Sequence, residues 1–118
     1  MVAARIYLED LGFEVEDTSA AKPYDFLARR RDEEVFVEVK GTTTSGEEII
    51  LTSNEVEHAR AHRSRCMLFI LYQIEVADGP EGPAAAGGTR RVLWPWDVDA
   101  GRLAPISYKC RIYSNTQP

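Results

Sequence analysis

The sequence predicts one α/β domain with a mixed β-sheet, in which helices and strands follow the order α-β-β-β-α-β and further strands come at the C-terminal end. The 118 residues suit a single compact domain that covers 1–118. Two segments with helical periodicity enclose three short segments in which apolar and polar residues alternate. The second helical segment precedes a nearly continuous apolar run at residues 67–74, which is typical of a strand buried on both faces. A strand, a helix and a strand in succession predict a right-handed crossover between parallel neighbours.

The first helix is expected at residues 3–11. Ala4, Leu8 and Leu11 fall on one helical face there, and Gly12 follows in the position of a C-terminal cap. A first strand is expected at residues 13–16, because two apolar residues alternate with two glutamates.

A β-hairpin is expected next, with strands at residues 24–29 and 35–40. The charged segment 30–33 would form the connection between them. This connection predicts that Arg29 pairs with Glu34 and that the register continues from there toward the beginning of the first strand.

Two carboxylates and one lysine are expected to share a face of this hairpin. The period of two in a strand puts Glu38 and Lys40 on one face, with the valines at positions 35, 37 and 39 on the other. The same register sets Asp25 directly opposite Glu38. Opposed like charges in a sheet repel each other, by about 3 kcal/mol at an effective dielectric near 20. A divalent cation that bridges both carboxylates would offset this repulsion, and hard oxygen ligands favour Mg²⁺ or Mn²⁺ over Zn²⁺.

This arrangement suits the hydrolysis of phosphodiester bonds. A bound metal ion polarises a phosphate and lowers the pKa of a bound water, while Lys40 would orient that water or neutralise charge on the phosphate. The structural alternative is that Asp25 only starts a strand, and that Glu38 and Lys40 pair with each other and with nearby arginines on an exposed polar face. For an E-x-K tripeptide alone, this alternative is the stronger one.

A capping box, T-S-N-E at residues 52–55, predicts the start of a second helix that runs to about residue 62 or 63. Thr52 would cap the helix, and Glu55 would reach back to the backbone amide of Thr52. An accessory role of Glu55 in metal or water binding is the alternative. His58 and His62 have the i, i+4 spacing that can chelate Zn²⁺, but no third ligand is placed, so solvated or hydrogen-bonded histidines are preferred.

The C-terminal third is expected to begin with a mobile surface loop at residues 77–89, which are rich in Gly, Pro and Ala. Two strands are expected to follow, at residues 91–96 and 106–113. The two tryptophans of the first are expected to pack rather than to stack on bases. Cys66 and Cys110 lie in apolar runs and are expected to be buried free thiols.

The net charge of −5 is unusual for a protein that binds nucleic acid, because affinity for phosphates comes from Lys and Arg. The arginines are nevertheless clustered, and solvated surface charge is the alternative to binding. The candidate contacts to nucleic acid are Arg29, Arg30, Arg31, Arg60 and Arg63. No apolar stretch is long enough to span a bilayer and no signal peptide starts the chain, so a cytoplasmic location without a membrane partner is expected.

Three motifs together resemble a known nuclease core. The segments P-Y-D-F at 23–26, V-E-V-K-G-T at 37–42 and L-T-S-N-E at 51–55 are similar to the Protein NO VEIN C-terminal domain family over about residues 2–73. That family is similar to PD-(D/E)xK, or restriction endonuclease-like, nucleases. The resemblance implies a restriction endonuclease-like core in which Asp25 and Glu38 bind Mg²⁺ or Mn²⁺, the backbone carbonyl of Val39 adds a ligand, and Lys40 assists hydrolysis.

The resemblance further implies a Mg²⁺-dependent nuclease domain that acts on nucleic acid, with DNA expected, as a module of a larger restriction, repair or defence protein. A homodimer is allowed. Related nucleases often carry a glutamate in the first helix, and counting back from residues 8–13 places it near Met1. Either the natural chain begins upstream or this acid is absent. The missing acid and the negative charge favour the alternative function, a catalytically inactive nuclease-like fold that serves as an interaction module for nucleic acid or protein.

Overall fold

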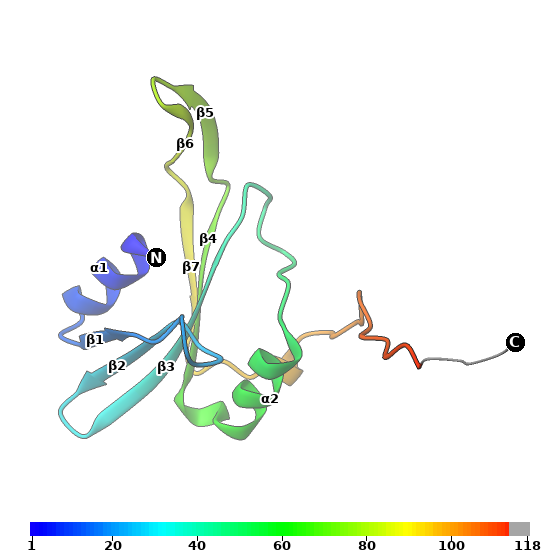
Figure 1. The fold of residues 1–118 in the computed structure, drawn as a ribbon. Coiled ribbons are helices and arrows are strands. Elements are labelled where there is room, and N and C mark those ends of the chain that lie inside the picture. Colours follow the sequence, from blue (N-terminus) through cyan, green and yellow to red (C-terminus); the bar gives the residue numbers. More distant parts are fainter. Residues whose placement is uncertain (114–118) are drawn as a thin grey trace, which may run out of the picture.

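A five-stranded mixed β-sheet with a helix on each face forms the centre of the protein (Figure 1). The structure is a computed structural model and describes residues 1–113 of the chain. The sheet has the strand order β1-β2-β3-β4-β7, with β3 and β4 parallel and the other neighbours antiparallel. The strands are β1 (Glu14–Asp17), β2 (Phe26–Arg30), β3 (Glu33–Gly41), β4 (Cys66–Tyr72) and β7 (Thr89–Leu93). The predicted α/β class, the mixed sheet and the order α-β-β-β-α-β are confirmed.

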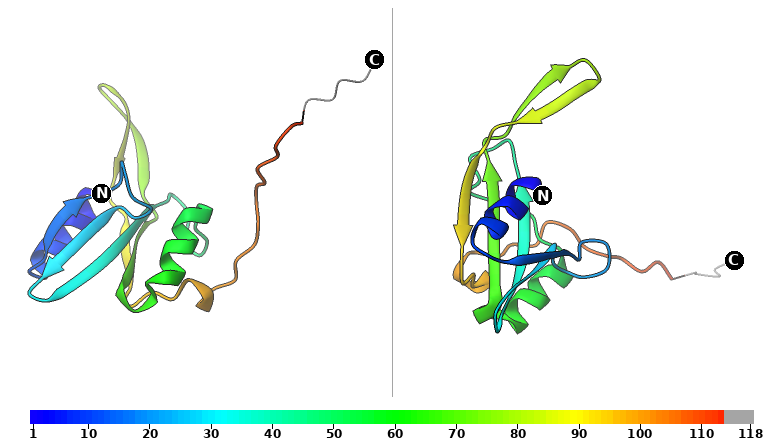
Figure 2. Two further views of the ribbon diagram at one scale, coloured as in Figure 1. Left: turned by 60° about the horizontal axis from the view of Figure 1, so that its bottom comes forward. Right: turned by 90° about the vertical axis from the view of Figure 1, so that its left-hand side faces the viewer.

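Two helices cover opposite faces of this sheet, as the two side views show (Figure 2). Helix α1 (Val2–Asp10) buries Ala4 and Leu8 against one face. Helix α2 (Ser53–Ala61) buries Ala59 in the cluster on the other face. Two short 3-10 helices, η1 (Arg63–Arg65) and η2 (Val98–Ala100), extend the α2 side. No helix in residues 1–113 is long and apolar enough to cross a membrane.

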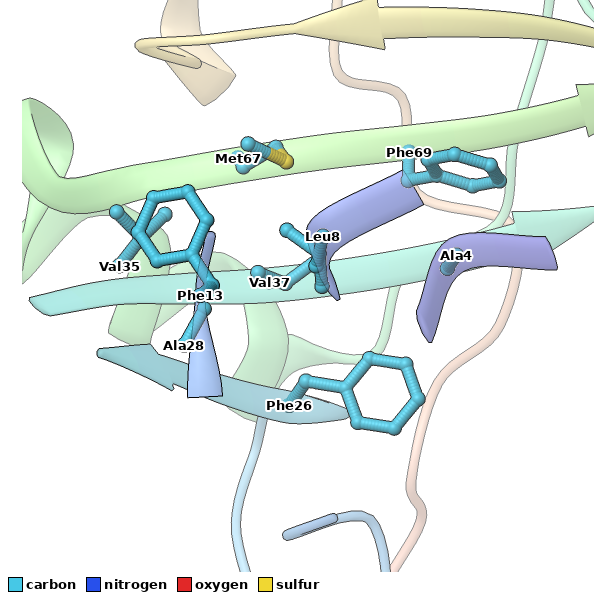
Figure 3. Close-up of a cluster of buried hydrophobic side chains, with 9 residues drawn as sticks. All are labelled: Ala4, Leu8, Phe13, Phe26, Ala28, Val35, Val37, Met67 and Phe69. Carbon is cyan, nitrogen blue, oxygen red and sulfur yellow. The ribbon is translucent and has the colours of Figure 1, made fainter. Parts of the chain in front are cut away.

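The core on the α1 side is built from the apolar residues that alternate along the strands (Figure 3). Val35 and Val37 of β3 are almost fully buried there, and Val39 packs at its margin. The other members are Ala4, Leu8, Phe13, Phe26, Ala28, Met67 and Phe69. Because successive side chains of a strand point to opposite faces, burial of these valines turns the polar residues of β3 toward α2.

The β2–β3 hairpin has the register that the sequence predicts. Arg29 lies opposite Glu34, and Leu27 lies opposite Phe36. The connection is shorter than expected, because Arg30 pairs with Glu33 and a two-residue turn remains. Arg31 takes a positive φ of 55° in this turn, which matches the twist of tight hairpins. Since the turn is centred where the sequence placed it, the predicted pairs within β2 and β3 are retained, whereas Asp25, which the prediction set opposite Glu38, lies just before β2 and outside the paired residues.

Both hydrogen bonds of the predicted capping box are formed at the start of α2. The hydroxyl of Thr52 accepts from the backbone amide of Glu55 at 3.2 Å, and the carboxylate of Glu55 accepts from the amide of Thr52 at 2.7 Å. The helix therefore begins at Ser53, as predicted, and ends at Ala61, close to the expected end.

Substitution of Thr52 by Ala is expected to lower the free energy of unfolding by about 1 kcal/mol, because the first turn of α2 loses its side-chain acceptor. The Ser53→Ala variant is the matched control, since Ser53 lies inside the helix and makes no cap. Urea unfolding of both variants measures the difference. Equal stabilities would show that Thr52 contributes nothing as a cap.

Two expectations for residues 77–96 are wrong in detail. Residues 77–89 do not form an irregular loop but contain most of a two-stranded hairpin, β5 (Glu75–Gly79) with β6 (Gly82–Ala86), which projects beyond the sheet (Figure 1). Gly79, Pro80, Gly82 and Pro83 lie at or beside its turn, where Gly82 has a φ of 106°, whereas Gly87 and Gly88 follow β6. The strand expected at 91–96 is β7, which lies earlier and ends at Leu93. Whether the hairpin is mobile stays a prediction.

No strand forms at residues 106–113, although apolar and polar residues alternate there. A strand needs a partner for its backbone groups, and within residues 1–113 no neighbour supplies one. The same absence of neighbours leaves Cys110 exposed, which corrects the expectation of a buried thiol. Cys66 is buried as expected, and burial raises the pKa of its thiol to about 11.

Candidate active site

Asp25 stands where the pairing of β2 with β3 ends. Its backbone amide donates to the carbonyl of Val37 at 2.9 Å. Its side-chain Oδ2 accepts from the backbone amide of Val39 at 2.7 Å, so the carboxylate takes the place of the next backbone carbonyl in the ladder. Asp25 is therefore held directly against the segment that joins Glu38 to Lys40.

Glu38 and Lys40 lie together on the α2 side of β3. The ammonium of Lys40 is 3.3 Å from Oε1 of Glu38. It is also 3.3 Å from Oε2 of Glu55, at the beginning of α2. Side-chain exposure is only 6% for Glu38, 23% for Lys40 and 17% for Glu55, so water screens this group weakly. The three side chains form one compact cluster with Asp25 at its border.

Burial raises the pKa of Glu38 to about 9, with further contributions from the neighbouring Glu55 carboxylate and the negative charge of Asp25. Burial also acts to raise the pKa of Glu55. The proximity of Glu38, the amide of Thr52 and the charge of Lys40 outweigh this effect and lower it to about 2. At neutral pH and without a metal ion, Glu38 therefore holds a proton while Glu55 is ionised. The repulsion expected between Asp25 and Glu38 is relieved by that proton.

An open pocket lies beside the cluster. Asp25 and Glu55 form part of its wall, together with the loop that precedes β2 and the first turn of α2. The remaining lining residues are Ser19, Ala21, Lys22, Pro23, Tyr24, Thr52 and Asn54. The position of this pocket gives a solvent molecule or a charged ligand access to the Asp25 side of the cluster.

The donor set suits a hard divalent cation in its chemistry. Within residues 1–113, no group of three or more His, Cys, Asp or Glu side chains is arranged to hold a metal ion by itself. The predicted set needs only the two carboxylates of Asp25 and Glu38 and one backbone carbonyl. The amide of Val39 faces Asp25, and in a strand the amide and carbonyl of one residue point to the same edge, so the Val39 carbonyl faces this side too. For Glu38 to bind a cation, it must release its proton.

Four of the five candidate nucleic-acid arginines lie in ion pairs. The pairs are Arg29 with Glu34, Arg30 with Glu33, and both Arg60 and Arg63 with Asp99. Arg31 lies in the turn of the β2–β3 hairpin. The arginines do not gather into one patch around Asp25, because the first group lies on β2 and its turn and the second joins α2 to η2. Their contact with nucleic acid stays a prediction.

Sequence reasoning missed an aromatic cluster beside the candidate site. The ring of His58 lies 4.6 Å from that of Tyr24 and 4.5 Å from that of His62, measured between centroids, and Phe36 packs against both histidines. Burial and the neighbouring imidazole lower the pKa of His58. The i, i+4 spacing of the histidines signalled that they share a face, but their packing partners come from β3 and the loop before β2.

The comparisons with known proteins give one match. The family model described as "Protein NO VEIN, C-terminal" matches residues 1–83 of the chain, from α1 to the beginning of β6. No curated protein and no solved structure matches significantly. The matched residues include Asp25, Glu38, Lys40 and Glu55 together with the sheet and helix that bring them together. Since the match covers more than half of the chain, the protein belongs to the Protein NO VEIN C-terminal family.

Proposed function

We propose that this domain is a Mg²⁺- or Mn²⁺-dependent nuclease of the PD-(D/E)xK type that hydrolyses phosphodiester bonds in DNA. The observation that carries the proposal is the convergence of Asp25 with Glu38 and Lys40. The carboxylate of Asp25 binds the Val39 amide between the other two residues, and its charge contributes to the raised pKa of Glu38. One residue just before β2 and two residues of β3 thus bring together the two acids and the lysine that the sequence motifs imply.

The residues divide the chemistry among them. Asp25, Glu38 and the Val39 carbonyl would hold the metal ion, which when bound polarises a phosphate and lowers the pKa of a water. Lys40 lies beside Glu38 and supplies a positive charge where negative charge develops on the phosphate. Glu55 also binds the ammonium of Lys40, and the capping box holds Glu55 in turn. We assign Glu55 the role of positioning Lys40 rather than of binding metal.

The family name describes a C-terminal part, and we propose that the domain acts as a module of a larger restriction, repair or defence protein. Nucleic-acid affinity would then come largely from other modules. The ion pairs of the arginines and the net charge of −5 support this division, because both reduce the affinity of the isolated domain for phosphates.

The direct test is nicking of supercoiled plasmid by the purified chain at increasing Mg²⁺ or Mn²⁺. We expect nicking that requires the cation, stops with a chelator, and increases as the pH rises, because Glu38 must lose its proton before it binds the ion. An activity that persists in the chelator would refute the proposal. The absence of nicking on plasmid, single-stranded DNA and RNA alike would favour the second function.

A second candidate function is an interaction module without catalytic turnover. The specific observation in its favour is the position of Lys40, which pairs with the ionised Glu55 beside the protonated Glu38, so that these three side chains carry no net charge without any metal ion. A cluster that is already neutralised has less need of a cation. This function predicts binding of nucleic acid or protein that is independent of Mg²⁺ and Mn²⁺.

The Asp25→Asn variant is expected to keep the stability of the metal-free protein within about 1 kcal/mol, because the Asn oxygen can still accept the Val39 hydrogen bond. Millimolar Mn²⁺ should stabilise the wild type by about 1 kcal/mol at several times its dissociation constant, and should do little for this variant. Thermal melts with and without Mn²⁺ measure both effects. Asp10→Asn, an exposed acid at the end of α1, is the control and should respond like the wild type. If Asp25→Asn is stabilised equally, the ion binds elsewhere.

A further inference from the structure

The C-terminal segment, residues 102–113, extends away from the body of the protein (Figures 1 and 2). Within residues 1–113, no backbone hydrogen bond joins it to the rest of the molecule. Its large apolar side chains are exposed, with 72% of Ile106, 86% of Tyr108 and 83% of Ile112 accessible to solvent. A run of apolar residues without a partner is unusual on the surface of a stable monomer.

The sequence of this segment has the pattern of a half-buried strand. Ile106, Tyr108 and Ile112 fall on one face, together with the cysteine at position 110, and Lys109 and Arg111 fall on the other. One face is therefore apolar and the other basic. A strand of this kind requires the free edge of a sheet, with an apolar surface on one side and acidic groups on the other.

The free edge formed by β1 presents two acids on one face and Val15 on the other, where the exposed Asp17 is hydrogen-bonded to Ser19. Val15 points into the core on the α1 side, so Glu14 and Glu16 point to the other face. Both are exposed. The carbonyl of Val15 faces away from β2, since it accepts a hydrogen bond from Arg5 at 3.3 Å. Within residues 1–113, the outward-facing backbone of β1 makes no other hydrogen bond.

A row of alternating charge crosses the sheet and ends at this edge. Glu16 lies 3.7 Å from Arg29, Arg29 lies 3.0 Å from Glu34, and Glu34 lies 2.7 Å from Arg65. At the β1 edge, the last member of the row is an acid, Glu16. A further strand outside β1 would continue the alternation if it carried basic residues, as Lys109 and Arg111 do.

The other edges do not match the segment. β7, the opposite edge of the sheet, carries Arg90 and Arg91 and no acid, so it would repel Lys109 and Arg111. In the hairpin, β5 carries Glu75 and Asp78, which are three positions apart and point to opposite faces. Charge and spacing together select β1.

We propose that residues 106–113 of one molecule pair with the β1 edge of a second copy, and that two copies exchange these segments reciprocally to form a homodimer. A second copy is the occupant because the segment follows β7 and η2 and points away from its own β1, which lies at the far edge of the sheet (Figure 1). In a reciprocal exchange with twofold symmetry, each segment pairs with the β1 edge of the other copy, so neither segment is left exposed. The inference is independent of the proposed nuclease activity.

Charge reversal with rescue tests this pairing by sedimentation equilibrium. The wild type is expected to dimerise. The double variants Lys109→Glu/Arg111→Glu and Glu14→Lys/Glu16→Lys should each weaken the dimer about ten-fold or more, because cross-strand attraction becomes repulsion. Their combination should restore it. The control Glu47→Lys/Glu48→Lys changes the net charge equally at exposed positions away from β1 and should leave the dimer intact.

The thiol of Cys110 supplies a second measurement, since it is exposed on the apolar face of the segment while Cys66 is buried. In the dimer, reaction of Cys110 with a thiol reagent should become slower as the protein concentration rises. The proposal is overturned if the wild type is monomeric at every concentration. It is also overturned if the dissociation constant of the dimer is unchanged in both charge-reversal variants. Protection of Cys110 that does not change with concentration would indicate pairing within one chain and would also overturn it.

Discussion

Replacement of Lys40 by Ala is expected to lower the rate of metal-dependent plasmid nicking by at least about 100-fold, because a charge aligned with the reacting phosphate is lost. Lys40 lies 3.3 Å from Glu38 in a site that water screens weakly, so its electrostatic effect is large. The fold should persist, since Glu38 keeps its proton and Val35 and Val37 stay buried on the other face.

Two measurements separate a catalytic Lys40 from a structural one. Lys22→Ala removes the same charge from the wall of the neighbouring pocket, outside the cluster, and should change the nicking rate only a few-fold. Stabilisation by Mn²⁺ should persist in Lys40→Ala, because the carboxylates remain and a competing positive charge is gone. Nicking by Lys40→Ala at the wild-type rate would show that Lys40 is only an ion-pair partner.

The Glu38→Gln variant is expected to remove a strong pH dependence of stability. The pKa of Glu38 is about 9 in the folded protein, above its ordinary value of 4.5. The folded state therefore binds the proton more tightly than the unfolded state does. This contribution to stability is complete below pH 4.5 and is lost as the pH rises through about 9, with a slope of up to about 1.4 kcal/mol per pH unit.

The clean window for this measurement lies between about pH 7 and pH 8.5. Below it, the lowered pKa values of His58 and Glu55 act in the opposite direction, and above it the raised pKa of Cys66 begins to contribute. Urea unfolding without metal should show a falling free energy of unfolding for the wild type in this window and a nearly constant one for Glu38→Gln. Parallel curves for the two proteins would mean that Glu38 is ionised in the folded state.

Much of the fold was predictable because its signals are local. The alternation of three valines with polar residues determined both β3 and the face that it buries. The hairpin register followed from the position of the charged connection, and the capping box located the first turn of α2. Each of these patterns operates over a few residues, so it does not depend on what the rest of the chain does.

The candidate site was predictable in its members but not in its electrostatics. The register placed Asp25 across from Glu38, and the period of two placed Lys40 beside Glu38. The sequence predicted two charged carboxylates, whereas burial leaves Glu38 protonated at neutral pH. That burial depends on α2, which covers this face of the sheet, and on β4, which pairs beside β3, and no short segment of the sequence contains this information.

The sequence by itself determined the α/β class, the order of the first helices and strands along the chain, the β2–β3 register and the start of α2, because these depend on local periodicity and turn chemistry. Only the tertiary structure decided which arginines are ion-paired, that Lys40 bridges Glu38 and Glu55, and that residues 106–113 have no partner within the described chain. The physical reason is that ion pairs, burial and strand pairing join residues that are distant in sequence. Alternation of apolar and polar residues shows that a segment can form a strand. It becomes a strand only when the edge of a neighbouring strand supplies partners for its backbone hydrogen-bonding groups.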